Sequence, residues 1–302
     1  MKRFFVKLLI FALPLIVAAA GISLLPLPAH SFNLAFLDKQ QLLARTPSPR
    51  LVFAGGSNCA FGIDSERIAE AFAIPVVNLG LNMAIGLGRI LDAASPLLRE
   101  GDILVIIPEY EHFTGLWNGK TAAYELILSM RQYRFLPRPG RYGLPRQFPI
   151  YLKTLIQGFT AQFRPPNPLA YRRDQFNRYG DYAGHLEIEN QDLAADEALG
   201  SLDRRAVNRF FRMAADLQAR GIRVFLSYPG YEAAVFDRSA GLIQDLDRIF
   251  RERLRVISRP GDYRFPRSLF YDTVYHLNAA GRSRRTEILR RDLEQTGVFP
   301  DL

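Results

Sequence analysis

Short apolar runs alternate along the chain with segments in which apolar residues recur at helical spacing. The clearest run, residues 102–108 (DILVIIP), contains five consecutive aliphatic residues and is typical of a buried strand. Strands that alternate with helices pair in parallel through right-handed crossovers. The pattern therefore predicts a three-layer α/β/α sandwich with about five parallel strands. The other strands are expected at residues 51–54, 76–79, 223–228 and 254–257, and helices at 64–72, 87–98, 203–219, 241–253 and 279–296.

The amino terminus has a different pattern. Three basic residues lie within the first seven, and residues 8–25 carry no charge. A positive flank before an apolar run is typical of a signal peptide or an uncleaved signal anchor. With its flank, the run approaches the ~20 residues that cross a bilayer. Because Leu27 makes a poor cleavage site, we expect residues 1–30 to be a transmembrane anchor; a cleaved signal peptide and a buried helix are the alternatives.

The composition narrows the class of protein. Of 302 residues, 48% are hydrophobic and the mean hydropathy is −0.04, which excludes a disordered chain. Only one segment is long and apolar enough to span, so a multi-pass membrane protein is excluded as well. The single cysteine, Cys59, excludes an intramolecular disulfide and a cysteine-rich zinc site. We expect one domain over residues 31–302, interrupted by an insertion at about 112–200.

The net charge of +9 is concentrated in residues 131–178. This segment holds ten basic residues and one acidic residue, a balance that equals the charge of the whole chain. The anchor and the positive-inside rule place the segment outside the cytoplasm, which argues against nucleic acid as a partner. A solvated loop, anionic lipid headgroups, an acidic glycan and a partner membrane protein all remain open. Residues 150–163 could lie along such a surface as an amphipathic helix.

Polar residues follow the predicted strands, where ligands bind in open α/β sheets. Ser57 follows the first strand in Gly55-Gly56-Ser57-Asn58, either as a nucleophile or as part of an ordinary turn. Asp272 and His276 precede the last helix, where they could activate a serine or simply cap that helix.

Further candidates lie after the second and third strands. Gly80 could present its N–H group to an oxyanion, with Asn78 or Asn82 adding a side-chain donor, or could serve turn geometry alone. After the third strand come Glu109, Glu111 and His112, for which we consider contacts to substrate, a metal ion and a solvated loop. Cys59 is a rival nucleophile, although a small buried side chain is the simpler interpretation.

The runs GGSN-x-x-FGID and FYDTVYHLN-x-x-G resemble the SGNH (GDSL-type) hydrolase superfamily. They are most similar to its membrane-anchored branch, which includes alginate O-acetylation proteins and the D-alanine transfer protein of teichoic acid synthesis. The resemblance implies Ser57 as nucleophile, His276 as general base and Asp272 as its orienting acid, with no metal or cofactor. It also implies an oxyanion hole formed by the N–H groups of Ser57 and Gly80.

Two departures from the family pattern bear on this assignment. The usual Asp-x-x-His spacing is Asp-x-x-x-His here, and the third-block GxND is absent, which leaves Asn58 or Asn82 as substitute donors. The resemblance implies an O-acyltransferase or esterase in the inner or cytoplasmic membrane, with a single anchor and its bulk in the periplasm. Its partners would be a cell-envelope polysaccharide and a membrane-bound O-acyltransferase. The alternative is a non-catalytic envelope protein that keeps the scaffold to bind glycan or the acyltransferase.

Overall fold

The computed structural model describes residues 31–120, 171–193, 198–295 and 297–299, with isolated positions between 3 and 21 and between 122 and 160. The chain divides into two compact units. One consists of Ala35–Gly119 and Asp174–Leu302, and the other of Met1–Leu34 and Lys120–Arg173. Most of the second unit lies outside the described residues, and so do most of the predicted anchor and most of the predicted basic surface. Within the part of the chain that is described, no helix is both long enough and apolar enough to cross a bilayer.

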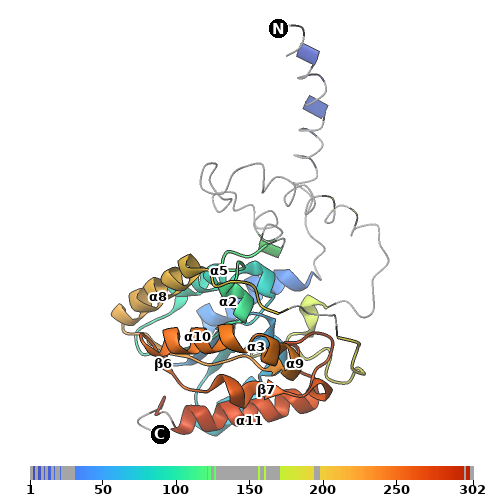
Figure 1. Ribbon diagram of the computed structural model, residues 1–302. Helices are drawn as coiled ribbons and strands as arrows, with labels where there is room; N and C mark the ends of the chain where they lie inside the picture. The colour runs from blue at the N-terminus through green and yellow to red at the C-terminus, as the bar shows by residue number, and fades with distance from the viewer. Residues whose placement is uncertain are drawn as a thin grey trace. The chain divides into compact units, whose positions relative to one another are not determined.

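The first unit is built on a five-stranded parallel sheet, as the sequence pattern predicted (Figure 1). Its order is β2-β1-β3-β4-β6. Leu51 on β1 lies opposite Val76 on β2 and Ile103 on β3, which sets the register of the three strands that carry the site. The strands are β1 (Leu51–Gly55), β2 (Val76–Asn78), β3 (Ile103–Ile107), β4 (Arg223–Leu226) and β6 (Arg255–Val256), and β5 (Tyr231–Glu232) pairs in parallel with β7 (Arg264–Phe265).

All five predicted helical segments form helices. Asp203 caps one of them by accepting from the N–H groups of Arg205 and Ala206, which satisfies donors that the helix itself leaves unpaired. The predicted helices are α4 (Ser65–Phe72), α5 (Leu87–Ala94), α8 (Arg204–Ala219), α10 (Ala240–Arg251) and α11 (Ala279–Gln295). The pattern did not indicate α2 (Ala35–Arg45), α3 (Ser57–Gly62), α9 (Ala233–Arg238) or the 3-10 segments, among them η2 (Met83–Ile85), η3 (Ser95–Leu97) and η4 (Tyr110–Phe113).

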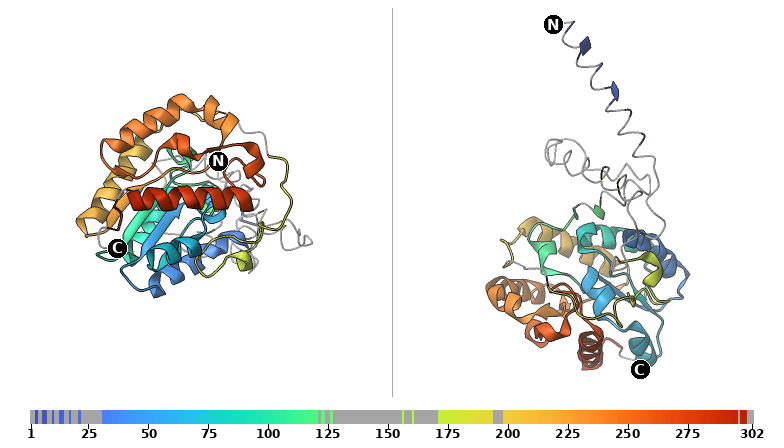
Figure 2. Two further views of the ribbon diagram at one scale, coloured as in Figure 1. Left: turned by 90° about the horizontal axis from the view of Figure 1, so that it is seen from below. Right: turned by 90° about the vertical axis from the view of Figure 1, so that its right-hand side faces the viewer.

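Every residue of β1 and β3 is buried, so helices cover the sheet on both faces. Ile103, Val105 and Ile107 of β3 pack into one cluster with Leu289 and Leu293 of α11. The alternate residues of β3 face the other side of the sheet, because successive side chains of a strand point in opposite directions. Figures 1 and 2 show helices on both sides of the sheet, an arrangement compatible with the predicted three layers.

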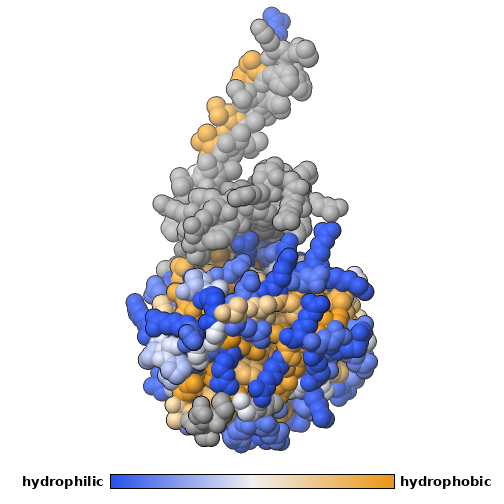
Figure 3. Space-filling model, turned by 90° about the vertical axis from the view of Figure 1, so that its left-hand side faces the viewer, coloured by the Kyte–Doolittle hydropathy of each residue, from blue (hydrophilic) through white to orange (hydrophobic). Residues whose placement is uncertain are grey.

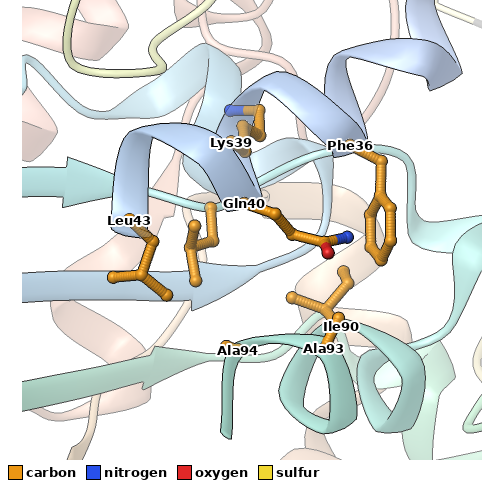
Figure 4. A pocket seen from close by; sticks show the side chains of 8 residues that line it. Phe36, Lys39, Gln40, Leu43, Ile90, Ala93 and Ala94 are labelled. Carbon is orange, nitrogen blue, oxygen red and sulfur yellow. The ribbon is translucent and has the colours of Figure 1, made fainter. Parts of the chain in front are cut away.

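Helix α2 is fastened to this sheet by a buried lysine. Lys39 Nζ donates to the carbonyl oxygens of Asn78 (2.9 Å) and Gly180, and burial lowers its pKa to about 7. A cavity of about 10 Å³ lies beside it between α2 and α5 (Figure 4). Phe36 and Ile90 line this cavity, which has room for one water molecule at most. It is a gap in the packing and too small to bind a ligand.

The outer surface of α8 and α10 mixes apolar and basic side chains. Figure 3 shows apolar surface between hydrophilic side chains on the face of the molecule that carries α8. A groove between the two helices is lined by Val207, Phe211, Arg248 and Arg253, among others. Arg248 pairs with Asp245 at 2.8 Å, and the Arg253 guanidinium lies over the Phe211 ring. Both arginines are therefore engaged by neighbouring side chains.

Candidate functional site

The site lies where the strand order of the sheet reverses. The chain leaves β1 for β2 on one side and then crosses to β3 on the other side. In open α/β sheets, ligands bind at this switch point, beyond the carboxyl ends of the strands. Ser57 follows β1 and Glu109 follows β3, so the topology brings two residues that are 52 positions apart to the same edge of the sheet.

Ser57 is the first residue of α3, directly after the turn at Gly56. Its Oγ is half-buried and donates to Glu109 Oε1 at 3.0 Å. A Cβ atom on Gly56 would lie 2.6 Å from the carboxyl carbon of Glu109, so only glycine lets the carboxylate come so close to the turn. The N–H group of Ser57 stands at the first helical position, where no intrahelical acceptor exists. The turn therefore presents both a hydroxyl and a backbone donor at the edge of the sheet.

Glu109 is fully buried beneath Ser57. Its Oε1 accepts three hydrogen bonds, from Ser57 Oγ, from Asn58 N at 2.7 Å and from Asn58 Nδ2 at 3.3 Å. Its Oε2 is buried and has no hydrogen-bond partner among the described residues. Because removal from water disfavours the charged form, burial raises the pKa of Glu109 to about 7.

A buried arginine supports this arrangement from α11. Arg285 donates to Asn58 Oδ1 at 3.1 Å and to the Asn58 carbonyl. Asn58 in turn points its backbone N–H and its side-chain amide at Glu109. The guanidinium therefore acts on the carboxyl group of Glu109 through Asn58, with an amide side chain between the two charges.

Asp272 and His276 form a hydrogen-bonded pair, with 2.8 Å between Asp272 Oδ1 and His276 Nδ1. The extra residue in the Asp-x-x-x-His spacing does not separate them. The imidazole stacks on Phe61 of α3, with ring centroids 3.9 Å apart and an interplanar angle of 8°. The pair thus packs against the helix that begins at Ser57. The alternative was that Asp272 and His276 only cap α11. That helix is capped by Asn278, whose Oδ1 accepts from Gly281 N at 2.9 Å.

The groups expected to bind an oxyanion are engaged within the protein. Gly80 N donates to Asn78 Oδ1 at 2.8 Å, and both donors of Asn58 are directed at Glu109. Asn82 Oδ1 accepts from Ala84 N and caps η2. A Cβ atom on Gly80 would lie 2.3 Å from Cys59 Cβ, so close packing accounts for this glycine. Of the expected backbone donors, only the N–H group of Ser57 has no hydrogen-bond acceptor within the described part of the chain.

The residues after β3 do not continue as a strand, since Tyr110–Phe113 forms η4. Glu111 Oε2 accepts from the hydroxyl of Tyr275 at 2.6 Å, which ties η4 to the loop that carries His276. His112 is buried, its Nδ1 accepts from Glu109 N, and burial lowers its pKa to about 4, so its imidazole is neutral. No group of three or more metal-binding side chains occurs among the described residues. His112 therefore contacts the protein interior, whereas Glu111 is half-buried and is bonded to Tyr275.

Three residues near the site were not singled out from the sequence. Phe61 stacks on His276, and His185 lies beside Phe61, with its Nε2 2.8 Å from the Leu277 carbonyl oxygen. Asp181 is buried and accepts from Ser65 Oγ, Asn78 Nδ2 and Arg282, which joins three elements. These residues belong to no local pattern, because their partners lie far away in the sequence.

Cys59 is excluded as a rival nucleophile. Its thiol is fully buried, and burial raises its pKa to about 12, so the reactive thiolate is suppressed. The interpretation of Cys59 as a small buried side chain is confirmed.

The site combines a serine hydroxyl, a buried carboxyl group and an aspartate–histidine pair. Ser57 contacts a buried carboxyl group, and an aspartate-bound imidazole packs on the helix that Ser57 begins. No protein-family model matches the chain, and no characterised protein matches it significantly in sequence.

Proposed function

We propose that this protein is an acyl-transfer enzyme, an O-acyltransferase or esterase, that forms an acyl-enzyme on Ser57. The observation that carries the proposal is the 2.8 Å hydrogen bond between Asp272 and His276, in a loop packed against the helix that begins at Ser57. A carboxylate on Nδ1 selects the tautomer and orientation of an imidazole and stabilises the imidazolium that forms during acyl transfer. An ordinary capping role would not require this pairing.

The chemistry follows from the groups at the switch point. Ser57 Oγ attacks the acyl carbonyl, and the N–H group of Ser57 faces the oxygen on which negative charge develops. A base of the site takes the Ser57 proton, a role that the resemblance implies for His276. Water or a sugar hydroxyl then attacks the acyl-enzyme, which yields hydrolysis or transfer.

The natural substrate that we propose is a cell-envelope polysaccharide, to which or from which the enzyme moves an O-acyl group. Two features of the sequence support this proposal: the anchor pattern of residues 1–30 and the resemblance to the membrane-anchored SGNH branch. They favour a flavodoxin-like SGNH domain held outside the cytoplasm by one transmembrane helix. The partner would be a membrane-bound O-acyltransferase that supplies the acyl group.

One observation favours a second function, that of a non-catalytic binding protein. The hydroxyl of Ser57 is hydrogen-bonded to Glu109, and the N–H groups of Gly80 and Asn58 are engaged within the protein. Such a site has fewer groups available to stabilise an oxyanion. A protein of this kind would use the same edge of the sheet to hold glycan or the acyltransferase without turnover.

Labelling with a fluorophosphonate separates the two functions. We expect the full-length chain in detergent to be labelled and Ser57→Ala to fall to background, because the reagent reacts covalently with an activated serine. Ser201→Ala, which removes an exposed hydroxyl ahead of α8, is the matched control and should label as the wild type does. If the wild type stays unlabelled while a control esterase reacts, or if Ser57→Ala labels normally, the binding protein is the correct assignment.

A further inference from the structure

The two oxygens of the Glu109 carboxyl group have different surroundings. Oε1 receives three hydrogen bonds, one of them from Ser57 Oγ, whereas Oε2 is buried without a partner in the described part of the chain. Buried carboxylates that serve only structure are usually hydrogen-bonded at both oxygens, because an unpaired buried acceptor costs free energy. The carboxyl group therefore commits Oε1 to Ser57 and Asn58, and Oε1 is the oxygen within reach of the Ser57 proton.

The charged and titratable groups around Glu109 do not neutralise it directly. From η4, Glu111 adds negative charge and disfavours ionisation of Glu109. From α11, the charge of Arg285 favours ionisation, but no hydrogen bond or ion pair joins it to the carboxyl group in the described residues, because its guanidinium donates to Asn58 instead. Cys59 on α3 and Tyr275 in the His276 loop are neutral, since burial raises the pKa of both groups. Desolvation dominates this balance, and the carboxyl group can gain or lose a proton near neutral pH.

On the assumption that the proposed acyl transfer is correct, we propose that Glu109 is the catalytic residue that takes the proton of Ser57, while the His276–Asp272 pair serves the acyl acceptor. The Ser57 Oγ to Glu109 Oε1 distance of 3.0 Å lies within the range for direct proton transfer. A base that titrates close to the working pH is also the most effective one. In this assignment the site contains two acid–base groups with separate tasks.

The first half-reaction uses Glu109. Ser57 Oγ bonds to the acyl carbon, the carbonyl electron pair moves to its oxygen, and the Oγ proton passes to Glu109 Oε1. The electron pair then returns, the bond from the acyl carbon to the leaving oxygen breaks, and that oxygen takes the proton from Glu109.

The second half-reaction uses His276. Its Nε2 accepts the proton of a water molecule or sugar hydroxyl as that oxygen bonds to the acyl carbon. When the intermediate collapses, Ser57 Oγ leaves and takes this proton from His276. Both acid–base groups are then restored to their initial state.

Pre-steady-state hydrolysis of p-nitrophenyl acetate tests the division of tasks, because this leaving group needs no acid. In Glu109→Gln, which keeps the shape of the side chain, the burst of nitrophenolate should slow by about 10²–10⁴-fold and lose its dependence on pH near 7. In His276→Gln, we expect a burst of one equivalent followed by arrest, since the acyl-enzyme forms but does not turn over. Asp292→Asn is the matched control and should leave both phases unchanged: the Asp292 carboxyl group lies on α11, accepts from the Tyr263 hydroxyl at 2.7 Å and also has a raised pKa, of about 6.

The outcomes separate this inference from the function on which it rests. If His276→Gln loses the burst while Glu109→Gln keeps its rate and pH profile, His276 is the base and the inference is wrong, although acyl transfer stands. A slower burst in Glu109→Gln with an unchanged pH profile would reduce Glu109 to a positioning role. If wild type and Ser57→Ala release nitrophenolate alike, both proposals fail.

An infrared titration keeps the inference testable even if Glu109→Gln does not fold. The titration uses the Asp292→Asn variant, because the raised pKa of Asp292 would add a second band. In this variant we expect an infrared band from the protonated carboxyl group of Glu109, and we expect it to disappear as the pH rises through about 7. The absence of such a band would show that Glu109 is ionised throughout and would overturn the assignment.

Discussion

Two buried carboxyl groups flank β3, and they share no hydrogen-bond or ion-pair partner among the residues that the structure describes. Asp102 stands immediately before the strand and Glu109 two residues after it, and both side chains are fully buried. Asp102 is paired with Arg50 at 3.1 Å and also accepts from Ser48 Oγ at 2.6 Å and Arg99 N at 3.0 Å. Glu109 has no ion pair among the described residues and holds the hydroxyl of Ser57 instead.

Because Asp102 lies at the amino ends of the strands and Glu109 at their carboxyl ends, the different partners of these two acids indicate different roles for the two ends. We call them the amino edge and the carboxyl edge of the sheet. At the amino edge, Arg50 also donates to the carbonyl oxygens of Thr46 and Leu97, so charge is used to join α2, β1 and η3. At the carboxyl edge, Arg285 donates to Asn58 and Asn58 donates to Glu109, and burial raises the pKa of Glu109 to about 7. Loss of one partner from a buried ion pair is costly because the other charge is left unpaired, whereas a buried carboxyl group with a raised pKa beside a hydroxyl is typical of a functional site.

The largest effect on stability is expected at the amino edge. Asp102→Asn should lower the free energy of unfolding by about 3–5 kcal/mol, because it leaves the buried guanidinium of Arg50 without its counter-ion. Urea denaturation of the full-length chain measures this loss. Asp245→Asn breaks an exposed pair with Arg248 and should unfold close to the wild-type midpoint. Equal losses in the two variants would contradict the structural role of the amino edge.

The next effect concerns pH at the carboxyl edge. The pKa of Glu109 rises from an ordinary 4.5 to about 7 on folding, so the folded state binds the proton more tightly than the unfolded state. The contribution of this proton to the free energy of unfolding is fully present below pH 4.5. It is lost as the pH rises through 7, a change of about 3 kcal/mol. Glu109→Gln should remove this decline from the pH dependence of the unfolding free energy. Parallel curves for wild type and variant would show that Glu109 titrates normally.

The smallest effects compare a glycine at each edge. Gly56→Ala places a Cβ atom 2.6 Å from the Glu109 carboxyl group, which should cost about 1–3 kcal/mol and abolish labelling of Ser57. Gly101→Ala, ahead of Asp102, has no atom closer than 4.0 Å to its new Cβ, so only its φ of +83° costs energy, about 1 kcal/mol. Its labelling should match the wild type. If Gly56→Ala labels normally, the close contact between the turn and Glu109 is dispensable.

The strands and long helices could be predicted because their signals are local. Residues 103–107 are all aliphatic and all buried, and the apolar positions of 203–219, such as Phe210 and Leu217, face the core as their spacing indicated. Helix α3 escaped prediction because its six residues, SNCAFG, are too few to show a helical period. Its position depends on packing against β1 and α11.

The candidate site could be predicted only as a set of residues. The patterns after the strands pointed to Ser57, Asp272 and His276, and the structure adds that the last two are hydrogen-bonded to each other. The patterns left Glu109 among several alternatives. Its contact with Asn58, and the contact of Asn58 with Arg285, join positions 51 and 227 residues apart, so no local pattern could reveal them.

The order and periodicity of residues along the chain were enough to establish a parallel sheet and to place polar residues at the ends of its strands. Which of those residues share a proton depends on the folded state. Protonation follows from burial and from the distance to other charges, and both arise only when β1, β3 and α11 pack together. Asp102 and Glu109 are both acids beside the same strand, yet packing gives one an arginine and the other a serine hydroxyl.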